Sequence, residues 1–348
     1  MISAALMTAV LATATSDPAA QHLQPPQGRH IEVAVALSEG AVMIDFAGPW
    51  EVFQDAMPPS ASGTPEMVFD LYTVAPSRAP VHTSGGTRPG MTVTPDFTFA
   101  DAPAPDVVVV GAQSGDPGLT AWLKKVHAEH ALILSVCTGV FRLAETGLLE
   151  GKSATTYHQR LQRFANQYPG VAVRSSVRYV QADPLIVTAG GLSSGIDAAL
   201  HIVELYFGRA VAQATADDME YQGEGWKTNV GLGEQREVRP TIPLAYRDRT
   251  THWQGIFLPA YPQQNPQQTV VLNLARTEQG YAATLDVPAE RVFGEPLNVQ
   301  VSNGRIHFTL DSDNGPLAFS GTLGAQAISG VVKGAGTSTP LNLHKLSH

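Results

Sequence analysis

The chain has 348 residues, more than one ordinary domain needs, and its composition of 43% hydrophobic and 15% charged residues excludes disorder over most of the length. The formal net charge of -9, with Lys and Arg scattered along the chain, argues against a nucleic-acid surface, which needs clustered cations. A single cysteine, Cys137, excludes an intramolecular disulfide and a cysteine-rich zinc site.

The N-terminal 30 residues differ from the rest of the chain. Met1–Ala14 is a small apolar run, and a polar, Pro-containing stretch follows it through His30. This pattern resembles the apolar region and cleavage zone of a secretory signal peptide, although the first cationic residue is Arg29. We therefore expect residues 1–30 to be a signal peptide and disordered tail, with a periplasmic or secreted location. The alternative is a mis-assigned start in a cytoplasmic protein. The run is too short for a membrane span.

From Ile31 onward, short β-branched runs alternate with longer amphipathic segments. Strands are expected at Ile31–Leu37, Phe69–Val74, Val107–Val110, Ala131–Val136 and Leu185–Ala189. Helices are expected at Pro49–Ala56, Leu119–Glu129, Val140–Leu149 and Ile196–Phe207. The run at 107–110 is apolar throughout, as in a strand that is covered on both faces. This alternation predicts an α/β domain, a parallel sheet with helices on both faces.

The pattern changes after about Trp226. Residues 223–250 are rich in Gly, Arg and Glu and are expected to be a linker. Residues 251–348 contain short alternating runs separated by turn signals such as Asn303-Gly304 and Asn314-Gly315. Many short strands at regular spacing predict a second domain, an antiparallel β-sandwich or barrel.

Cys137 follows an apolar strand directly and precedes Thr138-Gly139 and a helix. A nucleophile on such a turn projects into the crevice at the carboxyl end of a parallel sheet. The free N–H groups of the helix, led by that of Thr138, would stabilise an anion, and the helix N-terminus is expected to lower the pKa of the thiol. The alternative is a buried structural cysteine.

Asp45 lies between the first strand and the first helix, at the same rim of the sheet. Beside a cysteine, its carboxyl group would act as general acid or base. Helix capping is the alternative role, but Gly48 and Pro49 separate Asp45 from the expected helix, so we do not expect it at the cap. Glu51 is a weaker candidate.

Three further loops offer residues for a pocket. Gly111 follows a buried strand, and its N–H group is expected to be the second oxyanion donor. Gly191 lies in a Gly-rich loop that joins a strand to a helix and is expected to shape the pocket. His158 is a candidate to reach the cysteine, although a lone histidine is more often structural.

DFAGPWEVF at 45–53, SVCTGVFRLAETGLLEGKSATTYH at 135–158 and TAGGLSSGIDAALHIVE at 188–204 resemble the PfpI-like (ThiJ/PfpI) family of the class I glutamine-amidotransferase-like superfamily. The most similar branch resembles isonitrile hydratase and the ligand-sensing domains of AraC-type regulators. The resemblance spans about 31–222 and implies a flavodoxin-like fold, usually dimeric, with the cysteine on a strained elbow.

The resemblance also implies roles for particular residues. Cys137 and Asp45 correspond to the functional pair of isonitrile hydratase, and Thr138 lines the same site. Related sequences often carry His where Tyr157 stands, which leaves the part of His158 in the chemistry open. The C-terminal segment resembles a lipocalin-like β-rich module, interpreted as a ligand-binding or structural appendage.

Together these features predict a small-molecule enzyme that hydrates an isonitrile to an N-substituted formamide, with a Cys nucleophile, an Asp acid and base, and no metal or organic cofactor. Two alternatives stay open: another Cys-dependent hydrolase or glyoxalase-type activity, and a non-catalytic ligand or redox sensor. The regulator branch carries a helix-turn-helix domain after this fold, whereas this chain has β-type pattern there. We therefore expect a small-molecule substrate, a homodimer, and neither nucleic acid nor membrane as partner.

Overall fold

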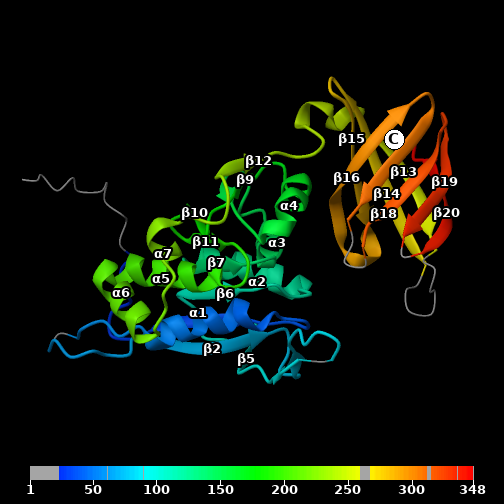
Figure 1. The fold of residues 1–348 in the computed structure, drawn as a ribbon. Coiled ribbons are helices and arrows are strands. Elements are labelled where there is room, and N and C mark those ends of the chain that lie inside the picture. Colours follow the sequence, from blue (N-terminus) through cyan, green and yellow to red (C-terminus); the bar gives the residue numbers. More distant parts are fainter. Residues whose placement is uncertain are drawn as a thin grey trace, which may run out of the picture.

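The computed structural model of the chain describes residues 23–60, 62–88, 90–258, 267–311, 315–334 and 336–347. These residues form an α/β domain and a C-terminal β-barrel beside it (Figure 1). The α/β class and the separate antiparallel module are therefore confirmed, and of the two forms considered for that module the structure shows the barrel. The apolar N-terminal run, with the signal peptide inferred from it, lies outside the described residues.

A seven-stranded sheet forms the centre of the α/β domain, in the order β10-β11-β7-β6-β1-β2-β5. Its strands in chain order are β1 (Ile31–Ala36), β2 (Phe69–Ala75), β5 (Phe97–Thr98), β6 (Val107–Val110), β7 (Leu132–Val136), β10 (Tyr179–Asp183) and β11 (Ile186–Ala189). Neighbouring strands are parallel, except that β10 pairs antiparallel with β11. The order from β2 to β11 is flavodoxin-like, and such sheets bind ligands at the carboxyl ends of the strands where the order reverses, here between β1 and β6.

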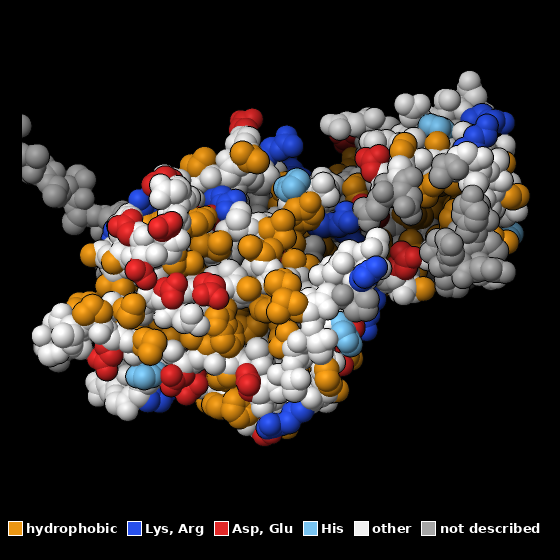
Figure 2. All heavy atoms as spheres, turned by 60° about the horizontal axis from the view of Figure 1, so that its bottom comes forward, with side chains coloured by type: hydrophobic (Ala, Val, Ile, Leu, Met, Phe, Trp, Pro, Cys, Tyr) orange, Lys and Arg blue, Asp and Glu red, His pale blue; other side chains and the backbone are white. Residues whose placement is uncertain are grey.

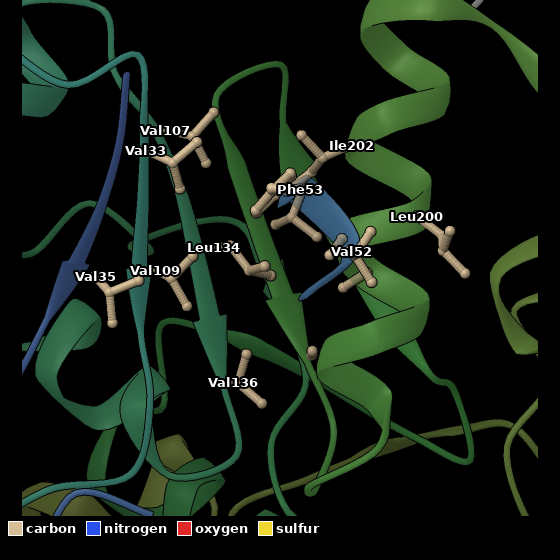
Figure 3. Close-up of a cluster of buried hydrophobic side chains, with 14 of the residues drawn as sticks. Val33, Val35, Val52, Phe53, Val107, Val109, Leu134, Val136, Leu200 and Ile202 are labelled. Carbon is tan, nitrogen blue, oxygen red and sulfur yellow. The ribbon is translucent and has the colours of Figure 1, made fainter. Parts of the chain in front are cut away.

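Helices cover both faces of this sheet. The first face carries α1 (Met43–Asp55), α5 (Ser194–Phe207), α6 (Arg209–Asp218) and α7 (Gly225–Thr228), and the second carries α2 (Pro117–Ala128), α3 (Gly139–Ala144) and α4 (Leu161–Gln167). Because successive strand residues point to opposite faces, Val33 and Val35 of β1 join the core with Phe53 of α1, whereas Ala34 joins the core with Leu123 of α2. Figure 3 shows the first of these cores, between the strands and the helices α1 and α5.

Two helix boundaries differ from those expected by more than two residues. The first helix begins at Met43, not at Pro49, so the expectation that Asp45 precedes the helix is wrong: Asp45 lies in the first turn of α1. The Gly-Pro pair is not a turn because Gly48 is where α1 packs against α5; a Cβ there would lie 2.9 Å from Cγ1 of Ile196. Pro49 is tolerated inside the helix, although its missing N–H leaves the carbonyl of Asp45 without the usual donor.

The second difference concerns the helix after the cysteine. It spans only Gly139–Ala144, and turns replace the expected continuation to Leu149. Thr146 marks this end, because its hydroxyl donates to the carbonyl of Leu143 (2.5 Å) and accepts the N–H of Leu148 (3.1 Å). Such local side-chain bonds give the backbone an alternative to the helix.

The segment 223–250, expected to be a linker, carries regular structure. It contains α7, the strand β12 (Arg236–Val238) and the 3₁₀ helix η2 (Leu244–Arg249). Strand β12 pairs antiparallel with β9 (Ala172–Ser175), which pairs parallel with β8 (Ser153–Ala154). This small sheet attaches the segment to the α/β domain before the chain enters the barrel.

Short elements complete the α/β domain and its edge. They are β3 (Val81–His82), β4 (Thr92–Val93) and η1 (His158–Arg160). Residues 23–30, which the sequence placed in the N-terminal tail, contact the domain: the N–H of Leu23 donates to the carbonyl of Leu205 (2.8 Å), and Arg29 forms an ion pair with Asp106 (2.5 Å).

The C-terminal module is a closed antiparallel barrel, β13-β14-β15-β16-β17-β18-β19-β20. Its strands are β13 (Thr251–Phe257), β14 (Gln268–Thr277), β15 (Gly280–Val287), β16 (Val292–Ser302), β17 (Arg305–Leu310), β18 (Leu317–Leu323), β19 (Ala327–Gly334) and β20 (Thr337–Lys345), with the 3₁₀ helix η3 (Pro288–Glu290) between β15 and β16. Trp253, Phe308 and Phe319 belong to its buried core. The expected turn at Asn303-Gly304 joins β16 to β17 with both residues at positive φ, as a tight hairpin requires.

The barrel docks on the α/β domain through α4. The side-chain amide of Asn166 donates to the carbonyl of Gly294 (2.7 Å), and Nη2 of Arg163 donates to the carbonyl of Arg291 (2.8 Å). These contacts place the turn between β15 and β16, and the start of β16, beside α4. In the part of the chain that the structure describes, no helix has the length and apolar character needed to cross a membrane.

Candidate active site

Cys137 lies on a strained elbow between β7 and α3. Its φ of +58° is in the left-handed region that side chains other than Gly rarely adopt, and its N–H donates to the carbonyl of Gly190 (2.9 Å). The next residue but one, Gly139, packs against the end of β6, where a Cβ would lie 2.2 Å from the carbonyl oxygen of Val110. The elbow is therefore fixed by close backbone packing, as is the strand-to-helix turn that carries the nucleophile in α/β-hydrolases.

Asp45 is fully buried in the first turn of α1, at the carboxyl end of β1. Its Oδ2 accepts the backbone N–H of Ala112 (2.9 Å). Its Oδ1 is buried without a hydrogen bond of standard geometry to the described residues, and the carboxylate also interacts with the thiol of Cys137. Asp45 thus has one oxygen fixed by the backbone and one oxygen available for a proton.

The carboxyl group and the thiol change each other's protonation. Burial raises the pKa of Asp45 to about 6, against the weaker opposing effects of the Ala112 N–H and the thiol. Burial, and then the charge of Asp45, raise the pKa of Cys137 to about 12. The N–H of Thr138 at the helix N-terminus does lower the thiol pKa, as does that of Leu192, but desolvation outweighs both, so the net shift is upward and not downward as expected. Near neutral pH the resting pair is therefore a carboxylate and a thiol, which hold one proton between them.

Two of the expected pocket residues, Thr138 and Gly111, contact different members of the Asp45–Cys137 pair. The N–H of Thr138 acts on the sulfur, and Gly111 packs against Asp45, where a Cβ would lie 2.7 Å from that of the aspartate. The second N–H group that acts on the sulfur belongs to Leu192, which sequence reasoning missed. Leu192 has a φ of +51°, and only its place in a Gly-rich loop next to the sheet edge hinted at a role.

The loop 190–194 and the segment 155–158 line a pocket of about 360 Å³ next to the elbow. Gly191 lies against Tyr157, where a Cβ would be 2.5 Å from Cδ2 of the ring, and His158 stacks edge-on to that ring at 4.4 Å. His158 lines the pocket but is exposed at its rim. Thr156 ties the segment to the elbow, because its hydroxyl donates to the carbonyl of Cys137 (2.8 Å).

Gly139→Ala is expected to destabilise the protein by about 3 kcal/mol, because the added methyl group would overlap a backbone carbonyl that cannot rotate away. Chemical denaturation measures the loss. The matched control is Gly147→Ala, at a φ of +80° with open space around it. This substitution is expected to lower the free energy of unfolding by only about 1 kcal/mol, the cost of a left-handed backbone conformation for alanine. Equal losses for the two variants would contradict the close packing of the elbow.

The fold and the elbow define a flavodoxin-like α/β protein with a buried cysteine–carboxylate pair at the sheet edge. The DJ-1/PfpI family model matches residues 31–205, and the chain belongs to this family. The family resemblance noted in the sequence is thereby confirmed. Within the described residues, no group of three or more His, Cys, Asp or Glu side chains is placed to hold a metal ion.

Relatives of different function share this domain. Isonitrile hydratase of Pseudomonas putida is 28% identical over 200 residues, which are 55% of this chain and 78% of that protein. The HTH-type transcriptional regulator GbdR of Pseudomonas aeruginosa is 27% identical over 210 residues, which are 57% of this chain and 53% of the regulator. A THiJ/PfpI family protein from Pseudomonas syringae, known from its crystal structure, is 24% identical, with a TM-score of 0.46 over 61% of this chain and 84% of its own. Membership of the family is thus compatible with an enzyme or a regulator.

Proposed function

We propose that the α/β domain is a small-molecule enzyme that hydrates an isonitrile to an N-substituted formamide, with Cys137 as nucleophile and Asp45 as general acid and base. The observation that carries the proposal is the buried pair itself: a carboxyl group whose pKa is raised to about 6 interacts with the lone thiol on a strained elbow. A carboxyl group with this pKa both accepts and returns a proton near neutral pH. The similarity to isonitrile hydratase supports the choice of substrate class.

In the first step the thiol adds to the isonitrile. The carboxylate of Asp45 takes the proton from Cys137 as the sulfur forms a bond with the terminal carbon of R–N≡C. Asp45 then returns that proton to the same carbon. The result is a thioimidate, R–N=CH–S, on the cysteine, and Asp45 is again a carboxylate.

In the second step water releases the product. Asp45 takes a proton from a water molecule whose oxygen adds to the thioimidate carbon, and then passes that proton to the nitrogen. As the C–S bond of the tetrahedral adduct, R–NH–CH(OH)–S, breaks, Asp45 takes the hydroxyl proton and delivers it to the departing sulfur, which gives R–NH–CHO, the free thiol and the carboxylate of Asp45. The N–H groups of Thr138 and Leu192 favour negative charge on the departing sulfur, which assists this cleavage.

Incubation of the full chain with cyclohexyl isocyanide tests the proposal. N-cyclohexylformamide is expected to accumulate over many turnovers, and acid quenching is expected to trap a thioimidate on the peptide that contains Cys137. If neither product nor adduct forms, isonitrile hydration is not the activity of this domain.

A second candidate function, ligand sensing without turnover, is favoured by the high pKa of the buried thiol, which leaves little thiolate at neutral pH. The similarity to GbdR points the same way, although it spans about half of that protein. The two functions differ in how product depends on time. A sensor binds the isonitrile stoichiometrically and releases it unchanged, whereas the enzyme continues to form formamide.

A further inference from the structure

A second cavity, of about 490 Å³, lies between the α/β domain and the barrel. Its α/β side is formed by the loop after β6, the start of α3 and the segment around η1 and α4, and its barrel side by residues 289–291. Thr138, the residue after the candidate nucleophile, is part of its wall. Figure 2 shows Lys and Arg side chains at the junction of the two domains.

The wall of this cavity is strongly basic. Arg142, Arg160 and Arg163 come from the α/β domain and Arg291 from the barrel, whereas Glu290 is its one acidic lining residue among those described. Glu290 is already hydrogen-bonded by Gln268. Two acidic residues outside the wall act on its arginines: Glu145 pairs with Arg142 (2.9 Å), and Glu295 attracts Arg163. The positive charge of the wall is therefore compensated only in part.

Arg163 has a buried hydrogen-bond donor that no described residue satisfies. Its Nη2 donates to the carbonyl of Arg291 (2.8 Å) and its guanidinium lies over the ring of Phe141 at 5.4 Å, but its Nε is buried without an acceptor in the described part of the chain. Burial lowers the pKa of Arg163, and the charges of Arg160 and Arg142 lower it further. A buried donor without an acceptor, surrounded by like charges, is costly unless an anion joins the group.

Arg160 places a cation at the cavity that has no partner among the described residues. In the described residues its side chain makes neither a hydrogen bond nor an ion pair, and its electrostatic effect on Arg163 is repulsive. Guanidinium groups bind carboxylates and phosphates through paired hydrogen bonds in a fixed plane. Several of them around one cavity therefore match an oxyanion.

We propose that this cavity binds the carboxylate or phosphate group of a small organic anion, held by arginines of both domains next to the cysteine elbow. The barrel then has a defined part in the site, because its turn at 289–291 closes the cavity and contributes Arg291, which is itself held to the α/β domain through the carbonyl of Ser114 (3.3 Å). This binding site does not depend on isonitrile hydration, and anion binding is measured without any turnover.

Calorimetric titration of the full chain with inorganic phosphate, and separately with succinate, at constant ionic strength tests the proposal and separates the two anion sources. Saturable binding of at least one of them is expected. Arg160→Gln is expected to weaken it about tenfold or more, since a charge-assisted hydrogen bond is lost. The charge-matched control is Arg305→Gln, on the exposed start of β17, and it is expected to leave the affinity unchanged. Absence of binding for both anions, or equal weakening by the two substitutions, would overturn the proposal.

Thermal unfolding is a second test, and it distinguishes an arginine that binds an anion from one with a purely structural role. Because Arg160 repels Arg163 and has no protein partner in the described residues, Arg160→Gln is expected to raise the Tm slightly in chloride buffer and to reduce the rise in Tm that a given anion concentration produces in the wild type. A lower Tm in chloride together with an unchanged response to the anion would contradict an anion site at Arg160.

Discussion

Cys137→Ser is expected to lower the rate of formamide production from cyclohexyl isocyanide by about 10³-fold or more, because a hydroxyl group next to one carboxylate is a far weaker nucleophile than a thiol. Initial rates at saturating substrate measure the loss.

The control for this variant is its fold. Serine keeps the size of the side chain at the elbow and accepts the same N–H groups, so the circular dichroism spectrum and the cooperativity of unfolding are expected to match those of the wild type. A folded serine variant that retains a rate within threefold of the wild type would rule out Cys137 as the nucleophile.

Asp45→Asn is expected to lower the same rate by about 10² to 10⁴-fold, because an amide neither accepts the thiol proton nor delivers it to carbon. The active form of the wild-type pair holds a single proton. Its kcat/KM is therefore expected to rise with pH through about 6 as Asp45 ionises, and then to stay level through mildly alkaline pH, since the pKa of Cys137 is raised to about 12. The residual rate of the asparagine variant is expected to lack the step near pH 6.

The same substitution is expected to stabilise the protein. The folded pKa of Asp45 is raised from 3.8 to about 6, so the folded state binds the proton more tightly than the unfolded state, and stability falls as pH rises through this interval. Asparagine keeps an acceptor for the Ala112 N–H and carries no charge. Its free energy of unfolding is expected to exceed that of the wild type by about 2–3 kcal/mol near pH 8 and by almost nothing near pH 4.

A matched aspartate should respond in the opposite direction. Asp197 is equally buried, but it forms an ion pair with Nε of Arg178 (2.5 Å) and accepts a hydrogen bond from the hydroxyl of Tyr221 (3.1 Å). Asp197→Asn leaves that arginine without its partner and is expected to cost about 3 kcal/mol near pH 8. If Asp45→Asn destabilises the protein to a similar extent, burial does not strain the charge of Asp45 as described.

The sheet and the elbow could be predicted from the sequence because both leave local patterns. Strands that are buried on both faces, such as Val107–Val110, are apolar throughout. A cysteine at the end of such a strand, followed by Thr-Gly, indicates a strand-to-helix turn. The start of α1 could not be predicted from the sequence, because the Gly48-Pro49 pair favours a turn locally. Its helical conformation depends on packing against Ile196 of α5. The tertiary contact therefore outweighs the local turn preference of the Gly-Pro pair.

The electrostatics of the site could not be predicted for a similar reason. The pKa of the thiol depends on how far the elbow is buried and on the approach of Asp45, and neither appears in the local pattern around Cys137. The N–H group of Leu192 reaches the sulfur from another strand-helix loop, 55 positions further along the chain. The arginine cavity is still less local, because Arg163 and Arg291 meet only through the docking of the barrel.

A single-site NMR titration tests most directly whether Asp45 and Cys137 share one proton at the sheet edge. Because the chain has one cysteine, incorporation of ¹³Cβ-labelled cysteine gives one resonance. We expect an inflection near pH 6 from Asp45, its disappearance in Asp45→Asn, and no thiol ionisation in the wild type between about pH 7 and 9. A wild-type resonance that is flat near pH 6, or one that titrates between pH 7 and 9 regardless of the residue at position 45, would contradict the shared proton.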